Sequence, residues 1–298
     1  MAEDGLPIPE GLLHPEAQRI AARYRISLDE ALAALRDAFA ARPELAQRIR
    51  KRHDREEVTR WRDYRDTVKA CRKEIYYRLR RHYTRPELAE RLLEEFETAA
   101  ADAAGPDHLR DLRERLLQTH VSTRERLEHL DEFHDWLFDG VGCPGSVLDL
   151  GCGLYPLCYP FDGRGDGTAI FVAVDDDERS IRAVRAFSRT LEEVRFTPVL
   201  RSLSDSHWLD DLPRPETYDV ALMLKLVPLL DRQAPDALAG LQRAPAARIV
   251  VTGSVQSMTR RRSVERRERA VLRRFIEQTG RRVVDEFRLP TEFGYLLE

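Results

Sequence analysis

The stretch VLDLGCG at residues 147–153 decides the fold of this 298-residue chain. A mostly apolar run leads directly into a turn that contains two glycines, Gly151 and Gly153. Glycine lets the backbone approach a ligand closely, and open parallel sheets bind ligands beyond the carboxyl ends of their strands. A dinucleotide-binding turn would carry a third glycine where this chain has Pro156. The turn is therefore a candidate cofactor site of another kind.

Acids and hydroxyls around this turn indicate what it binds. Asp149 precedes the two glycines, a pattern that favours S-adenosylmethionine, whose ammonium group can meet a carboxylate. Asp175 ends the next apolar run, where a carboxylate can accept hydrogen bonds from both hydroxyls of a ribose. Ser202 and Asp205 follow the third run, at a place that commonly faces an adenine, and the register favours Ser202. We expect these residues and the two glycines to bind the cofactor.

Short β-rich runs alternate with helical stretches through the second half of the chain. They lie at 146–150, 169–174, 194–200, 219–226, 247–253, 281–287 and 293–297. Such alternation predicts a mostly parallel sheet with helices on both faces. Only five residues, 288–292, separate the last two runs, too few for a parallel crossover, so these runs should form an antiparallel hairpin. We predict an α/β fold with a Rossmann-like, seven-stranded methyltransferase sheet of class I at 117–298.

The first part of the chain carries almost no β signal and predicts an all-helical N-terminal domain at 1–116. Capping boxes, in which a Ser or Thr and a Glu three residues later satisfy free backbone groups, mark helix starts. They occur at 27–30, 84–87 and 122–125. We expect five to seven helices over residues 1–138.

Charge is distributed unevenly along the chain. The formal net charge is −3, yet residues 48–85 hold 15 Lys and Arg against 6 Asp and Glu. A basic helical segment beside an acidic sheet domain favours contact with a polyanion such as RNA, with Arg78, Arg80 and Arg81 as docking residues. The alternative is a solvated helix face stabilised by ion pairs one turn apart.

Composition excludes several classes of protein. No run approaches the roughly 20 apolar residues that span a bilayer, and the acidic, proline-broken N-terminus does not resemble a secretory signal. The four cysteines form no CxxC pair, and histidine spacing is irregular, so neither a disulfide framework nor a metal site is expected. We expect a cytoplasmic protein without metal or membrane contact, more plausibly a monomer than an oligomer.

Four strings resemble one known family. They are HVSTRERL at 120–127, LDLGCGLYPL at 148–157, KLVPLLDR at 225–232 and TEFGYL at 291–296. They are similar to motifs of the aminoglycoside-resistance methyltransferases that modify N7 of a guanine in the decoding site of 16S ribosomal RNA. The resemblance covers most of the chain. It implies S-adenosylmethionine as cofactor, the 30S subunit as partner, Arg126 as the partner of the cofactor's carboxylate, and Lys225 as a further cofactor-site residue.

The chain departs from this family where the acceptor is expected. Tyr155 replaces an asparagine, and the stretch after the fifth strand, GSVQSMT at 253–259, differs from the family's and is followed by three arginines. The candidate substrate-binding residues near the acceptor are Tyr155, Gln256, Ser257, Arg260 and Arg261. The arginine-rich stretch 260–274 either clamps phosphates or forms a solvated helix.

The chemistry implied by the resemblance needs no general base, because guanine N7 has a free lone pair and no proton to lose. We therefore expect alignment of the reactants, with no catalytic acid or base. Two other functions stay open. One is a biosynthetic N-methyltransferase of small heterocycles on the same scaffold, and the other is an RNA-contact protein that binds the cofactor without activity.

Overall fold

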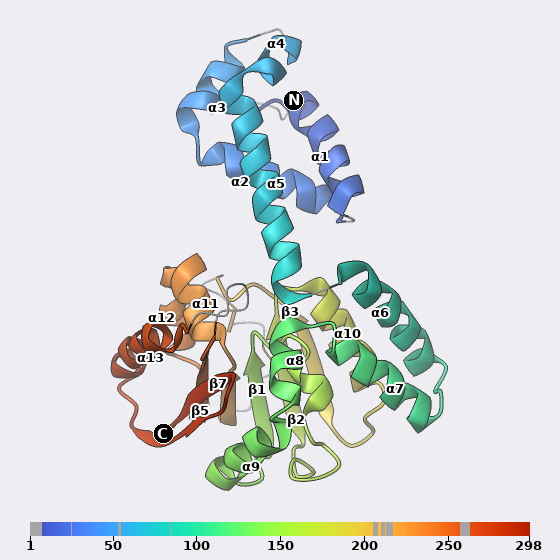
Figure 1. Ribbon diagram of the computed structural model, residues 1–298, viewed down its shortest axis with the longest axis vertical. Coiled ribbons are helices and arrows are strands. Elements are labelled where there is room, and N and C mark those ends of the chain that lie inside the picture. The colour runs from blue at the N-terminus through green and yellow to red at the C-terminus, as the bar shows by residue number, and fades with distance from the viewer. Residues whose placement is uncertain are drawn as a thin grey trace. The chain divides into compact units, whose positions relative to one another are not determined.

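The computed structural model describes residues 8–24, 26–52, 55–83, 85–204, 208–209, 212, 217–256 and 263–298. The chain divides into two compact units, Met1–His82 and Tyr83–Glu298 (Figure 1). The sequence pattern predicts this boundary after residue 116. The difference concerns two helices, α6 (Pro86–Ala101) and α7 (Pro106–Leu117), because a helical pattern does not show which core a helix joins.

Helices α6 and α7 belong to the core of the sheet unit. Leu92 and Phe96 of α6 are buried in the same apolar cluster as Phe187 of α10 (Glu178–Ser188). The guanidinium of Arg182 in α10 donates to carboxylates on α6, including Glu97 at 3.0 Å. Apolar packing and ion pairing thus attach α6 to the second unit.

The first unit is helical and has its own apolar core. It consists of α1 (Glu10–Tyr24), α2 (Leu28–Ala40), α3 (Pro43–Arg50), α4 (Arg55–Arg60) and α5 (Arg62–His82). The predicted cap at residue 27 is confirmed, because the Ser27 hydroxyl accepts from the amide of Glu30 at 3.1 Å. Buried residues such as Leu13, Leu35 and Phe39 form the core. No basic residue is among the described members of this core.

The second unit contains the predicted seven-stranded sheet. Its strands are β1 (Ser146–Leu150), β2 (Ile170–Asp175), β3 (Arg195–Leu200), β4 (Tyr218–Met223), β5 (Ala246–Ser254), β6 (Val283–Arg288) and β7 (Glu292–Leu297). The order is β3-β2-β1-β4-β5-β7-β6. Strands β1 to β5 are parallel, and β7 runs antiparallel to β5 and β6, so the predicted hairpin is confirmed. The class I methyltransferase fold is thereby confirmed.

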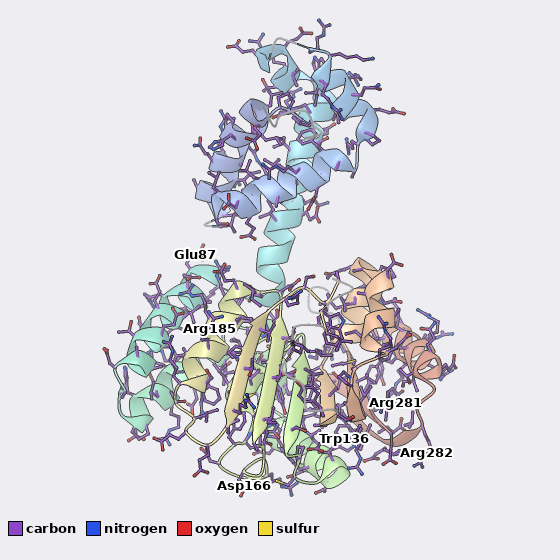
Figure 2. All side chains as sticks on the ribbon, turned by 180° about the vertical axis from the view of Figure 1, so that it is seen from behind. Glu87, Trp136, Asp166, Arg185, Arg281 and Arg282 are labelled. Atoms are coloured by element: carbon purple, nitrogen blue, oxygen red, sulfur yellow. The ribbon has the colours of Figure 1, made fainter. Side chains whose placement is uncertain are left out.

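Helices cover both faces of this sheet (Figures 1 and 2). One face packs against α9 (Leu130–Val141), α10 and the 3-10 turn η1 (Tyr155–Cys158). Trp136 of α9, labelled in Figure 2, contacts Phe287 of β6, with ring centroids 4.4 Å apart and ring planes tilted by 48°. The other face packs against α11 (Leu226–Gln233), α12 (Leu238–Leu241) and α13 (Glu265–Thr279). No helix among the described residues is long and apolar enough to cross a membrane.

Candidate functional site

The turn after β1 has a backbone conformation that is specific to glycine. Gly151 and Gly153 have positive φ angles of 65° and 50°, a region that side chains disfavour. A Cβ atom on Gly151 would also lie 2.7 Å from Cδ1 of Leu226 at the start of α11. The turn is anchored to the neighbouring strand, since the Gly151 amide donates to the carbonyl of Val174 at 2.8 Å. Backbone conformation and close packing both require glycine here.

Asp149 is a buried acid with no hydrogen-bond partner among the described residues. It lies in β1 and is fully buried, and neither of its carboxylate oxygens bonds to any described residue. Burial raises its pKa well above the usual range, although the nearby charge of Arg126 opposes the shift. An unpartnered buried carboxyl group next to the glycine turn is suited to binding a cationic ligand, because the cation would compensate its desolvation.

Asp175 lies at the carboxyl end of β2 and faces the same turn. Its Oδ2 accepts from the Gly153 amide at 2.8 Å, and its Oδ1 accepts from the Asp177 amide at 2.8 Å. Each carboxylate oxygen has further lone pairs, so these bonds leave room for ribose hydroxyls. Asp177 in turn caps α10 by accepting from the Ser180 amide. The structure thus brings Asp149, Gly153 and Asp175 together at one edge of the sheet.

Arg126 of α8 (Val121–Leu127) forms a buried ion pair with Glu292 of β7. Its Nε and Nη2 donate to the two carboxylate oxygens at 3.0 and 2.7 Å, and the side chains are 4% and 1% exposed. Burial alone would raise the pKa of Glu292, but the charges of Arg126 and Lys225 outweigh it and lower that pKa. The Thr252 hydroxyl also bonds to Glu292. This geometry places Arg126 near Asp149 with two of its nitrogen atoms already in use.

Lys225 precedes α11 in a left-handed backbone conformation with φ of 59°. Its amide donates to the Thr252 hydroxyl at 2.8 Å, and its Nζ pairs with Glu125 at 2.9 Å and lies 3.8 Å from Glu292. A residue other than glycine in this conformation is strained, and such strain clusters at functional sites. Lys225 therefore joins the carboxyl end of β4 to the Arg126–Glu292 pair.

The remaining predicted residues lie in less informative places. Ser202 is exposed just beyond β3, where its hydroxyl accepts from the Ser204 amide at 3.3 Å. Tyr155 is 1% exposed within η1, so its burial does not support the predicted substrate contact. Gln256 is exposed, and its backbone pairs with that of Ser263. This pairing closes the base of the loop after β5.

Several predicted positions lie outside the described residues. Ser257, Arg260 and Arg261 belong to this group, as does the adenine alternative Asp205. Arg78, Arg80 and Arg81 lie within α5, but their side chains are outside the described part of the molecule. Their proposed contacts therefore rest on sequence alone.

Three residues of the site were assigned no role by the sequence. They are Glu125, Thr252 and Glu292. Glu125 and Glu292 do lie within the family-like strings at 120–127 and 291–296, which was the available signal. Only the fold shows that these two strings meet, because their elements are far apart in the sequence.

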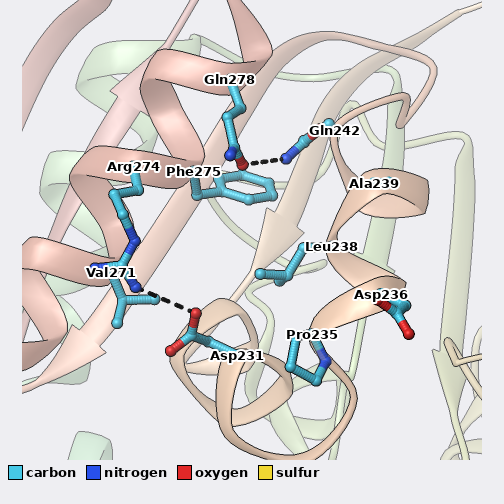
Figure 3. Close-up of a pocket in the computed structure, with 10 residues that line it drawn as sticks. All are labelled: Asp231, Pro235, Asp236, Leu238, Ala239, Gln242, Val271, Arg274, Phe275 and Gln278. Carbon is cyan, nitrogen blue, oxygen red and sulfur yellow. Dashed lines mark hydrogen bonds and ion pairs between the residues drawn. The ribbon is translucent and has the colours of Figure 1, made fainter.

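A pocket of about 450 Å³ lies elsewhere, between α11, α12 and α13 (Figure 3). Leu238, Val271 and Phe275 contribute apolar surface to it. Polar pairs border it, among them Arg274 with Asp231 at 3.3 Å. None of the residues that line this pocket lies at the glycine turn or at the ends of β1 and β2. The candidate site is therefore the turn with Asp149 and Asp175, and not this pocket.

Known proteins show the same combination of fold and motifs. Two curated relatives carry the name 16S rRNA (guanine(1405)-N(7))-methyltransferase. The Micromonospora echinospora relative is 41% identical over 135 residues, which cover 45% of this chain and 46% of the relative. The Frankia casuarinae relative is 33% identical over 166 residues, which cover 55% of each chain. The matched part thus spans about half the length of these relatives.

Solved structures match over nearly the whole chain. A structure of an rRNA methylase from Escherichia coli has a TM-score of 0.60 and 26% identity, with 96% of this chain and 99% of that chain covered. The 16S rRNA methylase RmtB has the same fold, with a TM-score of 0.61 at 24% identity and coverage of 96% and 98%. Residues 40–295 match the family model described as "Ribosomal RNA methyltransferase (FmrO)". The chain therefore belongs to the FmrO family of ribosomal RNA methyltransferases.

Proposed function

We propose that this protein uses S-adenosylmethionine to methylate N7 of a guanine in the decoding site of 16S rRNA within the 30S subunit. The observation that carries the proposal is the edge of the sheet where a glycine turn, the unpartnered Asp149 and Asp175 lie together. Family membership and the names of the relatives support RNA as the acceptor. Its site of action is then the cytoplasm, where it works as a monomer.

The residues at this edge fit the cofactor. Asp149 is a buried acid in need of a cation, which the ammonium group supplies. Asp175 accepts from the ribose hydroxyls, and Ser202 faces the adenine. Arg126 pairs with the cofactor's carboxylate through Nη1, since Glu292 occupies Nε and Nη2. Lys225 holds the neighbouring carboxylates in place.

When bound, S-adenosylmethionine supplies an electrophilic methyl group on a sulfonium. The protein's task is to align guanine N7 with this group and to exclude water. No residue has to remove a proton, because N7 carries none. Cys152 is no candidate nucleophile, since burial raises the pKa of its thiol well above the usual value.

RNA contact is assigned to two basic segments. Residues 48–85, with Arg78, Arg80 and Arg81, dock the protein on phosphates, since this segment carries an excess of nine positive charges. The segment that follows β5 in the sequence, with Gln256, Ser257, Arg260 and Arg261, contacts the target base.

The decisive experiment is incubation of 30S subunits with methyl-labelled S-adenosylmethionine, followed by mapping of the labelled base. We expect one guanine N7 in the decoding site. Asp175→Ala is the matched control, because loss of its acceptor should weaken S-adenosylhomocysteine binding about ten- to a hundredfold and abolish labelling at limiting cofactor. A wild-type protein that binds S-adenosylhomocysteine but labels no 30S base would contradict the ribosomal assignment.

The second candidate is N-methylation of a small heterocycle. The observation that favours it is the stretch 253–259, which differs from the resistance-methyltransferase pattern. Aminoglycoside resistance of a bacterium that expresses the protein distinguishes the two candidate functions. A guanine N7 enzyme expressed in a susceptible bacterium raises resistance to 4,6-linked deoxystreptamine aminoglycosides, whereas a small-molecule enzyme leaves it unchanged.

A further inference from the structure

Tyr83 lies at a junction of contacts that the sequence did not single out. It is the first residue after α5 and is 3% exposed. Its hydroxyl donates to Oδ2 of Asp177 at 3.1 Å and lies 3.1 Å from the Ser180 hydroxyl. Both partners are at the start of α10, which follows the strand that ends in Asp175.

The ring of Tyr83 contacts a second structural element. Its backbone forms an antiparallel bridge with His120, and the two rings meet edge to face with centroids 5.3 Å apart. The His120 ring packs directly on the glycine turn, since a Cβ atom on Gly153 would lie 2.7 Å from its Cε1. The Nδ1 atom of His120 faces the Thr123 hydroxyl at 2.8 Å, which fixes the ring at the start of α8.

Both sets of contacts lead to the same glycine. On one side, the Tyr83 hydroxyl donates to the Asp177 carboxylate. The Asp177 amide in turn donates to Asp175, which also accepts from the Gly153 amide, each at 2.8 Å. On the other side, the Tyr83 ring contacts the His120 ring, and the His120 ring packs against Gly153 where a Cβ atom would lie. Tyr83 therefore supports the turn through its hydrogen bonds and through its ring, although it does not touch Gly153 itself.

We propose that Tyr83 is a positioning residue for the cofactor turn, acting through Asp177 and Asp175 on one side and through His120 on the other. The inference rests on the proposed function, because it takes the turn at 151–153 to be the cofactor site. Tyr83 immediately follows the basic helix α5 in the chain, and its contacts with Asp177 and His120 are all non-covalent. A change at Tyr83 then alters cofactor affinity without removing any cofactor contact.

The test compares two buried tyrosines that each lose one hydroxyl. Tyr83→Phe breaks the bonds to Asp177 and Ser180, whereas Tyr159→Phe breaks a 2.9 Å bond to Thr168 that lies away from the turn. Thermal unfolding and calorimetric titration with S-adenosylhomocysteine are measured on both full-length proteins. We expect similar losses of melting temperature. Only Tyr83→Phe should raise the dissociation constant, by about three- to tenfold.

His120→Asn provides an independent second variant. Asparagine is a good helix cap, so α8 keeps its start while the ring over Gly153 is lost. We expect the same weakening of S-adenosylhomocysteine binding, and this variant decides the matter if Tyr83→Phe does not fold. Wild-type affinity in both the Tyr83 and His120 variants would overturn the inference and leave the cofactor assignment intact. A wild-type protein that does not bind S-adenosylhomocysteine would remove the cofactor assignment and the inference together.

Discussion

The helical unit and the sheet unit use charged residues in different ways. In the helical unit, the partners of the exposed ion pair Arg62–Asp66 are 89% and 55% exposed. In the sheet unit, Arg126 and Glu292 are 4% and 1% exposed. Exposed pairs contribute little to stability and leave their charge available to a partner, whereas a buried charge depends on the group that faces it. Loss of one partner should therefore cost much more stability at the buried pair than at the exposed pair.

The largest expected effect is on the buried pair. Arg126→Met leaves the Glu292 carboxylate buried without its partner, which should lower the free energy of unfolding by about 3–5 kcal/mol. Arg62→Met in the helical unit is the control and should cost less than about 0.5 kcal/mol. Adding Glu292→Leu to Arg126→Met should recover most of the loss, because the buried pair is then removed as a whole and Lys225 keeps Glu125 as its partner. Urea denaturation measures the unfolding free energy of all three variants. Equal losses in Arg126→Met and Arg62→Met would contradict the expected difference between the buried and the exposed pair.

The second effect concerns pH and the buried His134 of α9. Burial, with the charges of Arg126 and Arg164, lowers the pKa of His134 to about 4. An unfolded histidine takes up its proton near pH 6.5, so the unfolded state binds more protons between these values. The unfolding free energy should therefore fall as pH drops from about 6.5 to 4, by roughly 3 kcal/mol in total. His134→Phe should flatten this part of the stability profile, and an unchanged slope in the variant would rule out His134 as its cause.

A smaller effect of mixed sign is expected at Asp149. Burial raises its pKa well above the usual value, so the ionised form costs stability, and this cost grows as pH rises toward the folded-state pKa. Asp149→Asn should stabilise the ligand-free protein at pH 8 but not at pH 4, while weakening S-adenosylhomocysteine binding about tenfold. Calorimetry and denaturation at the two pH values test both parts. Unchanged affinity would exclude Asp149 from the cofactor site.

The smallest effect on stability should come from the helical unit. Replacing Arg78, Arg80 and Arg81 of α5 with glutamate should change the unfolding free energy by no more than about 1 kcal/mol. The same change should weaken 30S binding at least about tenfold at low salt and flatten its salt dependence. The matched control reverses three arginines on α6 and α7, namely Arg91, Arg110 and Arg115. Equal 30S affinity in the two triple variants would show that the basic segment 48–85 does not dock on RNA.

Local patterns predicted much of the molecule correctly. Alternating apolar runs located the seven strands, and the short link at 288–292 predicted the antiparallel hairpin. The glycine turn at 151–153 directly follows β1, and Asp175 lies at a strand end, both as expected. These features depend on a few consecutive residues and on backbone preferences, so they can be recognised without knowing the rest of the fold.

Long-range packing decided what those patterns could not. Arg126 and Glu292 are 166 positions apart, and only the arrangement of α8 beside β7 brings them together. The assignment of α6 and α7 to the sheet unit, the burial of Tyr155 and the unpartnered carboxyl group of Asp149 depend in the same way on which elements pack together. A side chain's partner and its exposure to water are properties of the assembled core. The sequence therefore determined the strands and the place of the glycine turn, but not the number of helices in the first half, where five to seven were expected and the described residues form α1 to α9. The tertiary structure decided which charges are paired, buried or left for a ligand.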